Sequence, residues 1–161
     1  MAKQKEIKTN AMRILDRMKI SYTHQSYECE EFIDGIQTAD HLGLPHDLVY
    51  KTLVTLGSSR QYFVFVLPIE AELDMKKAAR TVSEKSVSMI HVKDITAVTG
   101  YVRGGCTAIG MKKQYKTVIS DTARNLQKIY VSGGKIGCQI ELSPDDLCKA
   151  CGAVYGDIIV D

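Results

Sequence analysis

The chain has 161 residues, of which 45% are hydrophobic and 25% are charged, and its formal net charge is +2 at pH 7. This length predicts a single domain over residues 1–161, with a core large enough to fold without a metal ion or disulfide. The small net charge excludes indiscriminate binding of nucleic acid, and no uninterrupted apolar stretch approaches the ~18 residues of a membrane span.

The first half of the chain predicts two helices followed by a hairpin. Thr9 and Asn10 are typical helix caps, and Met12, Leu15 and Met18 then recur on one helical face. The next predicted elements are a strand over 21–27, a helix over 34–42 closed by Gly43, and strands over 49–56 and 62–67. The turn between the last two strands reads Gly-Ser-Ser-Arg, so we expect this hairpin to form the centre of a sheet.

The second half predicts shorter elements around a glycine-rich loop. They are a helix over 75–82 capped by Asp74, a strand over 86–90, a helix over 93–98, the loop over 100–110, strands over 117–120, 128–131 and 137–142, a helix starting near Thr122, and a helix from Ser143 to Gly152. Ser143 is followed by Pro144 and two acids, which is a strong helix start. Strands interspersed with helices predict an α+β or mixed α/β fold.

The glycine-rich loop resembles a phosphate-binding loop only in part. Such a loop needs lysine directly after its second glycine, and Met111 stands there after Gly110. Closely spaced glycines nevertheless allow backbone N–H groups to approach an anion or a carbonyl. A ligand-binding nest and a tight structural loop are both consistent with this segment.

The cysteines and histidines form no recognisable metal or redox motif. The five cysteines are Cys29, Cys106, Cys138, Cys148 and Cys151, an odd number that predicts free thiols. Together with a charged N-terminus that no apolar segment follows, they indicate residence in the cytoplasm. The pair Cys148 and Cys151 lies at a helix end, which favours ordinary burial. The four histidines lack metal-ligand spacing, so we expect neither metal nor cofactor.

Lys51 interrupts an apolar strand. Most isolated strand lysines lie on a solvated face, which is one reading of this position. On a central strand with both faces covered, a lysine requires an anionic partner or a cleft, which makes Lys51 a candidate site residue. Lys112, Lys113 and Lys116 follow the glycine-rich loop and form a basic run that can meet phosphates or simply face solvent.

Ordered segments through most of the chain resemble the YbaK/EbsC family, the stand-alone relatives of the editing domain of bacterial prolyl-tRNA synthetases. The matching segments are residues 20–22, 27–28, 42–44, 49–53, 73–77, 99–105, 110–113, 129–135 and 140–142. The resemblance implies a mixed, largely antiparallel, barrel-like sheet surrounded by helices. It also implies an enzyme that deacylates mischarged Cys-tRNA(Pro), with prolyl-tRNA synthetase as a further candidate partner.

Carried over by position, the resemblance also implies the site residues. The catalytic candidates are Lys51, Gly104 and Gly105, the substrate-binding candidates are Tyr27, Thr52, Thr107, Ser132 and Gln139, and the tRNA-binding candidates are Lys112, Lys113 and Lys135. Two positions depart from the family pattern. Ala108 replaces the proline of the loop motif Gly-Gly-x-Ser-Pro-x-Gly, and Gln139 replaces an acidic residue.

An aminoacyl ester is already activated, so the expected enzyme needs only to position a nucleophile and stabilise an oxyanion. Backbone N–H groups at Gly104 and Gly105 are candidates for the second task. The nucleophile is either the thiol of a cysteinyl substrate or a water molecule. The departures at Ala108 and Gln139 keep open a deacylase of altered specificity, acting on Ala- or Ser-tRNA, and a non-catalytic module that binds aminoacyl-tRNA or a nucleotide.

Overall fold

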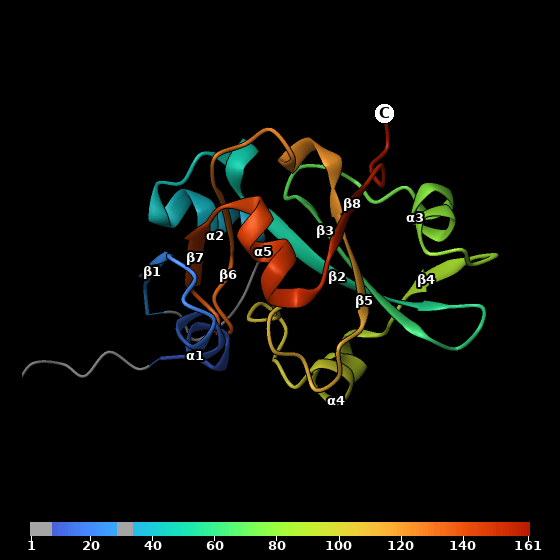
Figure 1. Ribbon diagram of the computed structural model, residues 1–161, viewed down its shortest axis with the longest axis horizontal. Helices are drawn as coiled ribbons and strands as arrows, with labels where there is room; N and C mark the ends of the chain where they lie inside the picture. Colours follow the sequence, from blue (N-terminus) through green and yellow to red (C-terminus); the bar gives the residue numbers. More distant parts are fainter. Residues whose placement is uncertain (1–7, 29–33) are drawn as a thin grey trace, which may run out of the picture.

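The computed structural model describes residues 8–28 and 34–161, and it shows two sheets with helices packed around them (Figure 1). The elements in chain order are α1 (Asn10–Arg17), β1 (Thr23–Ser26), α2 (Gly35–Leu42), β2 (Tyr50–Gly57), β3 (Tyr62–Pro68), α3 (Met75–Thr81), β4 (Val87–Met89), α4 (Ile95–Thr99), β5 (Lys116–Ser120), β6 (Ile129–Ser132), β7 (Cys138–Leu142), α5 (Pro144–Cys151) and β8 (Val154–Gly156). Short 3₁₀ turns lie at His46–Leu48, Val92–Asp94 and Asp121–Ala123.

The larger sheet has the strand order β4-β2-β3-β5-β8, and the smaller has the order β1-β7-β6. The pairs β2/β3, β2/β4, β1/β7 and β6/β7 are antiparallel, whereas β3/β5 and β5/β8 are parallel. The predicted hairpin is therefore confirmed and lies inside the larger sheet. The mixed, largely antiparallel architecture is confirmed too, although a parallel bridge between Val49 and Tyr130 joins two sheets where one barrel-like sheet was expected.

Strand β3 shows how the sequence builds a core on each face of the larger sheet. Val64 and Val66 point into a core that includes apolar residues of α1 and α5, whereas Phe63, Phe65 and Leu67 point into a second core with α3. All five side chains are buried. A continuous apolar run is expected of a strand that is covered on both faces.

The predicted caps at the helix ends are confirmed. The Thr9 hydroxyl, the Asp74 carboxylate and the Ser143 hydroxyl accept backbone N–H bonds at the starts of α1, α3 and α5. Gly43 and Gly152 close α2 and α5 in the left-handed conformation, with φ of 69° and 67°. Side-chain caps of this kind contribute about 0.5–2 kcal/mol each.

Three elements differ from the sequence predictions. The helix expected near Thr122 is wrong, because residues 121–123 form a single 3₁₀ turn and the segment before β6 offers only Ala123 and Leu126 for burial. The strand expected over 21–27 is shorter, spanning Thr23–Ser26. Strand β8 was missed, since its three residues carry no local signal and pair in parallel with β5.

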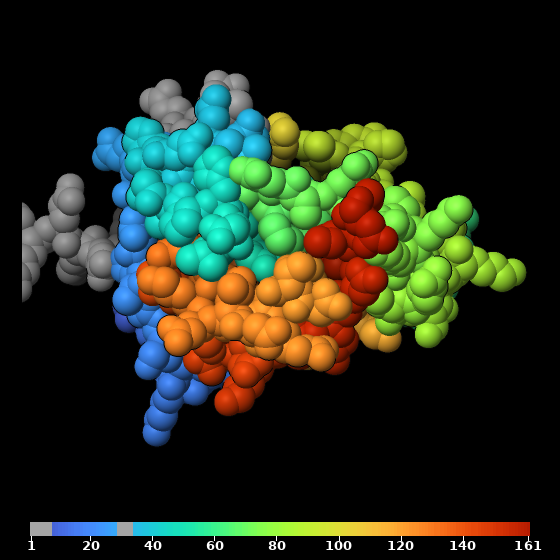
Figure 2. Space-filling view, turned by 90° about the horizontal axis from the view of Figure 1, so that it is seen from above, coloured from blue at the N-terminus to red at the C-terminus, as the bar shows by residue number. Residues whose placement is uncertain are grey.

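The C-terminal residues lie against the surface that includes α3 (Figure 2). The Lys77 ammonium donates to the carboxylates of Asp157 and Asp161 and to the carbonyl of Ile159, at 2.8–3.3 Å. These bonds hold the end of the chain against α3. Within the described ranges, no helix has the length and apolar character needed to cross a bilayer.

Candidate active site

A pocket of about 420 Å³ lies along one edge of β2, between the two sheets. Strand β4 pairs with the end of β2, from Thr55 to Gly57, and the smaller sheet is bridged to this edge at Val49, the residue just before β2. The edge between these two contacts carries no pairing strand among the described residues. The fold therefore leaves a gap in which β2 itself forms one wall.

Residues from six parts of the fold line this pocket. They are Asp34, Gly35 and Ile36 at the start of α2, Val49 to Val54 of β2, Ile69 after β3, Met89, Ile90, Val92 and Ile95 around β4 and α4, Arg103, Gly104 and Cys106 of the glycine-rich loop, and Ser132 and Gln139 of β6 and β7. The structure thus brings together five predicted site residues, namely Lys51, Thr52, Gly104, Ser132 and Gln139.

The backbone of Thr52 faces this pocket. The Val49 carbonyl accepts the Ile69 N–H on the β3 side, and the Val54 carbonyl accepts the Ile90 N–H on the β4 side. Because the N–H and C=O groups of successive strand residues alternate in direction, those of Thr52 point to the β4 side, where β4 has already diverged. Thr52 therefore offers one donor and one acceptor to a ligand.

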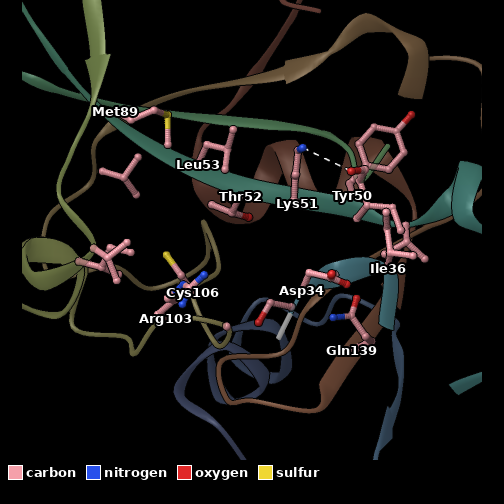
Figure 3. Close-up of a pocket in the computed structure, with 18 of the residues that line it drawn as sticks. Asp34, Ile36, Tyr50, Lys51, Thr52, Leu53, Met89, Arg103, Cys106 and Gln139 are labelled. Carbon is pink, nitrogen blue, oxygen red and sulfur yellow. Dashed lines mark hydrogen bonds between the residues drawn. The ribbon is translucent and has the colours of Figure 1, made fainter. Parts of the chain in front are cut away.

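Lys51 lies half-buried on the pocket wall, and its ammonium donates to the Ile69 carbonyl at 3.3 Å (Figure 3). Burial lowers the pKa of Lys51 below its ordinary value of 10.5, and the charge of Glu72 opposes this shift. No described carboxylate forms an ion pair with it. In Figure 3 the amine is turned away from Arg103 and Cys106, which lie on the other side of the β2 ribbon. Lys51 is thus a partly desolvated cation held by one weak neutral contact.

The glycine-rich loop presents Gly104 at a tight turn. Gly105 donates its N–H to the Val102 carbonyl at 3.0 Å, which makes Arg103 and Gly104 the central residues of a β-turn. Gly104 has φ of 85°, the value that position i+2 of a type II turn requires. Among the described residues, the Gly104 N–H has no acceptor. Gly104 is therefore the candidate oxyanion donor of this loop.

Gly105 contributes differently from the sequence prediction. Its N–H is already bonded to Val102, and it does not line the pocket. A Cβ added to it would lie 2.8 Å from the backbone Cα of Lys135. Gly105 thus allows two backbone segments to approach closely, and its expected role as a second oxyanion donor has no support in this geometry.

Gln139 and Ser132 lie opposite each other on β7 and β6. Gln139 is 9% exposed, and its buried Oε1 has no hydrogen-bond partner among the described residues. In Figure 3 its amide points into the pocket beside Asp34, whose carboxylate accepts the Gln37 N–H that caps α2. A buried polar atom without a partner costs free energy, so the Gln139 amide is a position where a ligand group is expected to bind.

Cys106 brings a thiol to the pocket, but not a reactive one. Burial raises its pKa to about 11, and a hydrogen bond with Thr99 only partly opposes this shift. The thiol is therefore protonated at neutral pH, and a protonated thiol is a poor nucleophile. Cys138, Cys148 and Cys151 are free thiols too, and Cys29 lies outside the described residues. Burial of Cys151 within the larger core confirms the ordinary packing predicted for that end of α5.

The remaining predicted site residues lie outside the pocket lining. Tyr27 stacks on His41 with ring centroids 3.9 Å apart, and Thr107 is fully buried, with its hydroxyl accepting the Ile109 N–H. The three lysines predicted to bind tRNA, namely Lys112, Lys113 and Lys135, are exposed around the glycine-rich loop. Their predicted contact with tRNA stays a prediction, whereas the buried Thr107 hydroxyl is used within the loop.

Several lining residues were not predicted from the sequence. Asp34 was read only as the start of a helix, and Arg103 was not considered although it directly precedes Gly104 and Gly105. Met89 and Val92 are 47% and 57% exposed, which a strand or helix pattern does not reveal. The position of Arg103 beside the glycines was the one available signal.

Comparison with known proteins identifies relatives of this architecture. Residues 33–150 match the family model of the aminoacyl-tRNA editing domain. The chain is 41% identical over 160 residues to an Enterococcus faecalis protein named "Putative Cys-tRNA(Pro)/Cys-tRNA(Cys) deacylase EbsC", with 98% of both chains covered.

Solved structures share the fold at lower identity. A "putative trans-editing enzyme for prolyl tRNA synthetase" superposes with a TM-score of 0.79 at 17% identity, covering 97% of this chain and 100% of the other. A hypothetical protein superposes with a TM-score of 0.83 at 20% identity, covering 92% and 97%. These two likenesses concern the fold alone.

Proposed function

Because the chain belongs to the aminoacyl-tRNA editing domain family, we propose that it hydrolyses the ester linking a tRNA to a wrongly attached amino acid. Cysteine carried by the proline tRNA is the first candidate substrate, by analogy with the name of the relative that is 41% identical. Prolyl-tRNA synthetase, which would release the mischarged tRNA, is the candidate partner in trans. The reaction would take place in the cytoplasm, where tRNA is charged.

The observation that carries this proposal is that Lys51, Gly104 and Gln139 line one pocket. They supply a cation, a backbone N–H and a polar acceptor, which match the three charges of an aminoacyl ester during its hydrolysis. The carbonyl oxygen becomes negative, the nearby phosphate is negative, and the α-ammonium is positive. The pocket needs no side-chain nucleophile, because the ester is already activated and positioning supplies much of the rate.

In the proposed reaction, the Gly104 N–H donates to the carbonyl oxygen as it becomes an oxyanion. Lys51, whose amine is turned away from Arg103 and Cys106, leaves its 3.3 Å contact with the Ile69 carbonyl and turns its ammonium toward the ester. Preorganised donors of this kind typically contribute factors of about 10²–10³ to kcat. The tetrahedral intermediate then collapses, and the ribose oxygen leaves with a proton.

Two nucleophiles fit this pocket. With a cysteinyl substrate, its own thiol, whose unperturbed pKa is about 8.5, can attack the carbonyl as a thiolate. The new carbon–sulfur bond replaces the ester bond, the ribose oxygen leaves with a proton, and water then opens the resulting thiolactone to give free cysteine. With an alanyl or seryl substrate, a water molecule must attack, releasing the free amino acid. Cys106 is excluded from this role by its protonated thiol.

A panel of mischarged tRNAs tests the proposal. Purified protein is incubated with labelled Cys-tRNA(Pro), Cys-tRNA(Cys), Ala-tRNA(Pro) and Pro-tRNA(Pro), and loss of labelled ester is followed with the Lys51→Met variant as a control for contaminating activity. We expect the cysteinyl tRNAs to lose their label fastest. Tight binding of these tRNAs without hydrolysis would show that the protein is a binding module and not an enzyme. Faster loss of label from Ala-tRNA(Pro) would show that alanine, not cysteine, is the amino acid removed.

A further inference from the structure

Apolar side chains form one end of the pocket, beyond the groups that the proposed reaction uses. We call this end the apolar lobe, and it consists of Leu53 on β2, Met89 and Ile90 at the end of β4, and Val92 and Ile95 before and in α4. Figure 3 shows Leu53 and Met89 on one side of Lys51, with Asp34, Ile36 and Gln139 on the other. The pocket therefore has a polar end and an apolar end, with Lys51 between them.

Exposure at the apolar lobe is high for its residue types. Met89 and Val92 are 47% and 57% exposed, and both belong to the seven exposed large hydrophobic residues found in the described part of the chain. Exposed apolar side chains that gather around a cavity mark a binding site more often than scattered ones do. Because they open onto the same pocket as Lys51, their ligand is part of the molecule that binds there.

The geometry points to the base of the terminal tRNA nucleotide as the occupant of the apolar lobe, an inference that rests on the proposed function. A volume of about 420 Å³ is in the range that holds ligands of drug size, larger than a cysteinyl group needs. If the α-ammonium binds near Gln139 and the ester lies near Gly104, the ribose and its base must extend from the ester toward the other end.

The chemistry of the apolar lobe suits a flat aromatic ring. The thioether of Met89 is polarisable and packs well against the ring of a nucleobase, and Leu53 and Val92 add apolar contact. Arg103, which lines the same pocket and is exposed, adds a cation where the phosphate attached to this nucleotide would lie. A base bound in this way is held by van der Waals contacts and shape complementarity, and its hydrogen-bonding edge faces solvent.

Methionine methyl NMR tests this inference without relying on catalysis. The chain has six methionines, and Met18 is 45% exposed, close to the 47% of Met89, but lies at the end of α1 outside the pocket lining. A non-hydrolysable amide analogue, cysteinyl-3′-amino-3′-deoxyadenosine, is added to the ¹³C-methyl-labelled protein, in parallel with the same analogue lacking the base. We expect a ring-current shift of the Met89 methyl with the first analogue only, and none at Met18.

Substitution supplies the second arm. Met89→Ser should weaken binding of the adenosine analogue by roughly three- to tenfold and leave binding of the base-free analogue unchanged, whereas Met18→Ser should change neither. An unshifted Met89 methyl, or equal effects with both analogues, would overturn the base-binding role and assign the apolar lobe to the acyl side chain. Binding of the base through Met89 without any hydrolysis of aminoacyl esters would instead retain this inference and reject the proposed function.

Discussion

Replacing Lys51 by methionine separates its chemical role from its structural one. Methionine keeps an unbranched apolar stem and removes only the ammonium, which has a single acceptor at 3.3 Å, the Ile69 carbonyl. If that ammonium stabilises charge in the transition state, its loss should lower kcat by about 10²–10³-fold, or about 2.7–4 kcal/mol. The free energy of unfolding at neutral pH should stay the same or rise, because the variant no longer buries a charge.

The pH dependence gives the sign of the same effect. Burial lowers the folded pKa of Lys51 below 10.5, so the folded state loses this proton at a lower pH than the unfolded chain does. The destabilisation is therefore fully present below the folded pKa and is relieved as pH rises through it. Any stability advantage of Lys51→Met at neutral pH should disappear above about pH 10.5.

The assay combines single-turnover deacylation with thermal unfolding. Lys116→Met, at the exposed first residue of β5, is the matched control and should change neither rate nor stability by much. Deacylation by Lys51→Met within about tenfold of the native rate would mean that the ammonium supplies less than about 1.4 kcal/mol, and the reasoning would fail. Loss of both activity and stability would show a structural role instead.

Three further perturbations probe the rest of the pocket. Gly105→Ala should lower both stability and kcat, because its Cβ would lie 2.8 Å from the Lys135 Cα. The control Gly43→Ala, with φ of 69° and nothing within 4 Å of its Cβ, should cost only the backbone strain of about 1–2 kcal/mol and leave the rate unchanged. Equal losses of rate in the two variants, each corrected for the folded fraction found by chemical denaturation, would contradict this. Gln139→Leu should raise the free energy of unfolding by about 1–3 kcal/mol, since it removes a buried oxygen without a partner. The same variant should bind aminoacyl analogues more weakly. Unchanged affinity, measured by calorimetry, would show that Gln139 is not part of the site. Cys106→Ala should keep kcat within a fewfold and leave its pH profile unshifted, because burial holds the pKa of the thiol at about 11; abolished turnover in this folded variant would restore a protein nucleophile.

The elements that sequence patterns predicted well are those whose signals are local. The apolar run of β3 and the caps Asp74 and Ser143 depend on neighbours within a few residues, and the structure confirms them. Strand β8 depends on its pairing with β5, which is distant in the sequence. Local patterns carry no signal for such pairings.

For the site too, local sequence features could be predicted, whereas features that depend on tertiary contacts could not. Lys51 was a candidate because a lysine in an apolar strand is unusual, whereas Gly104 was carried over by position from the family resemblance. The gap along β2 that joins them arises because β4 pairs only from Thr55 onward, a tertiary fact. The distinction between Gly104 and Gly105 likewise required the hydrogen bond from the Gly105 N–H to Val102, which no motif encodes.

The most direct measurement is a crystal structure of the protein with the cysteinyl-3′-amino-3′-deoxyadenosine analogue. We expect the acyl carbonyl oxygen to accept a hydrogen bond from the Gly104 N–H, with the Lys51 ammonium turned from Ile69 toward the ligand. An acyl group bound elsewhere, or a carbonyl oxygen that meets neither group, would contradict it.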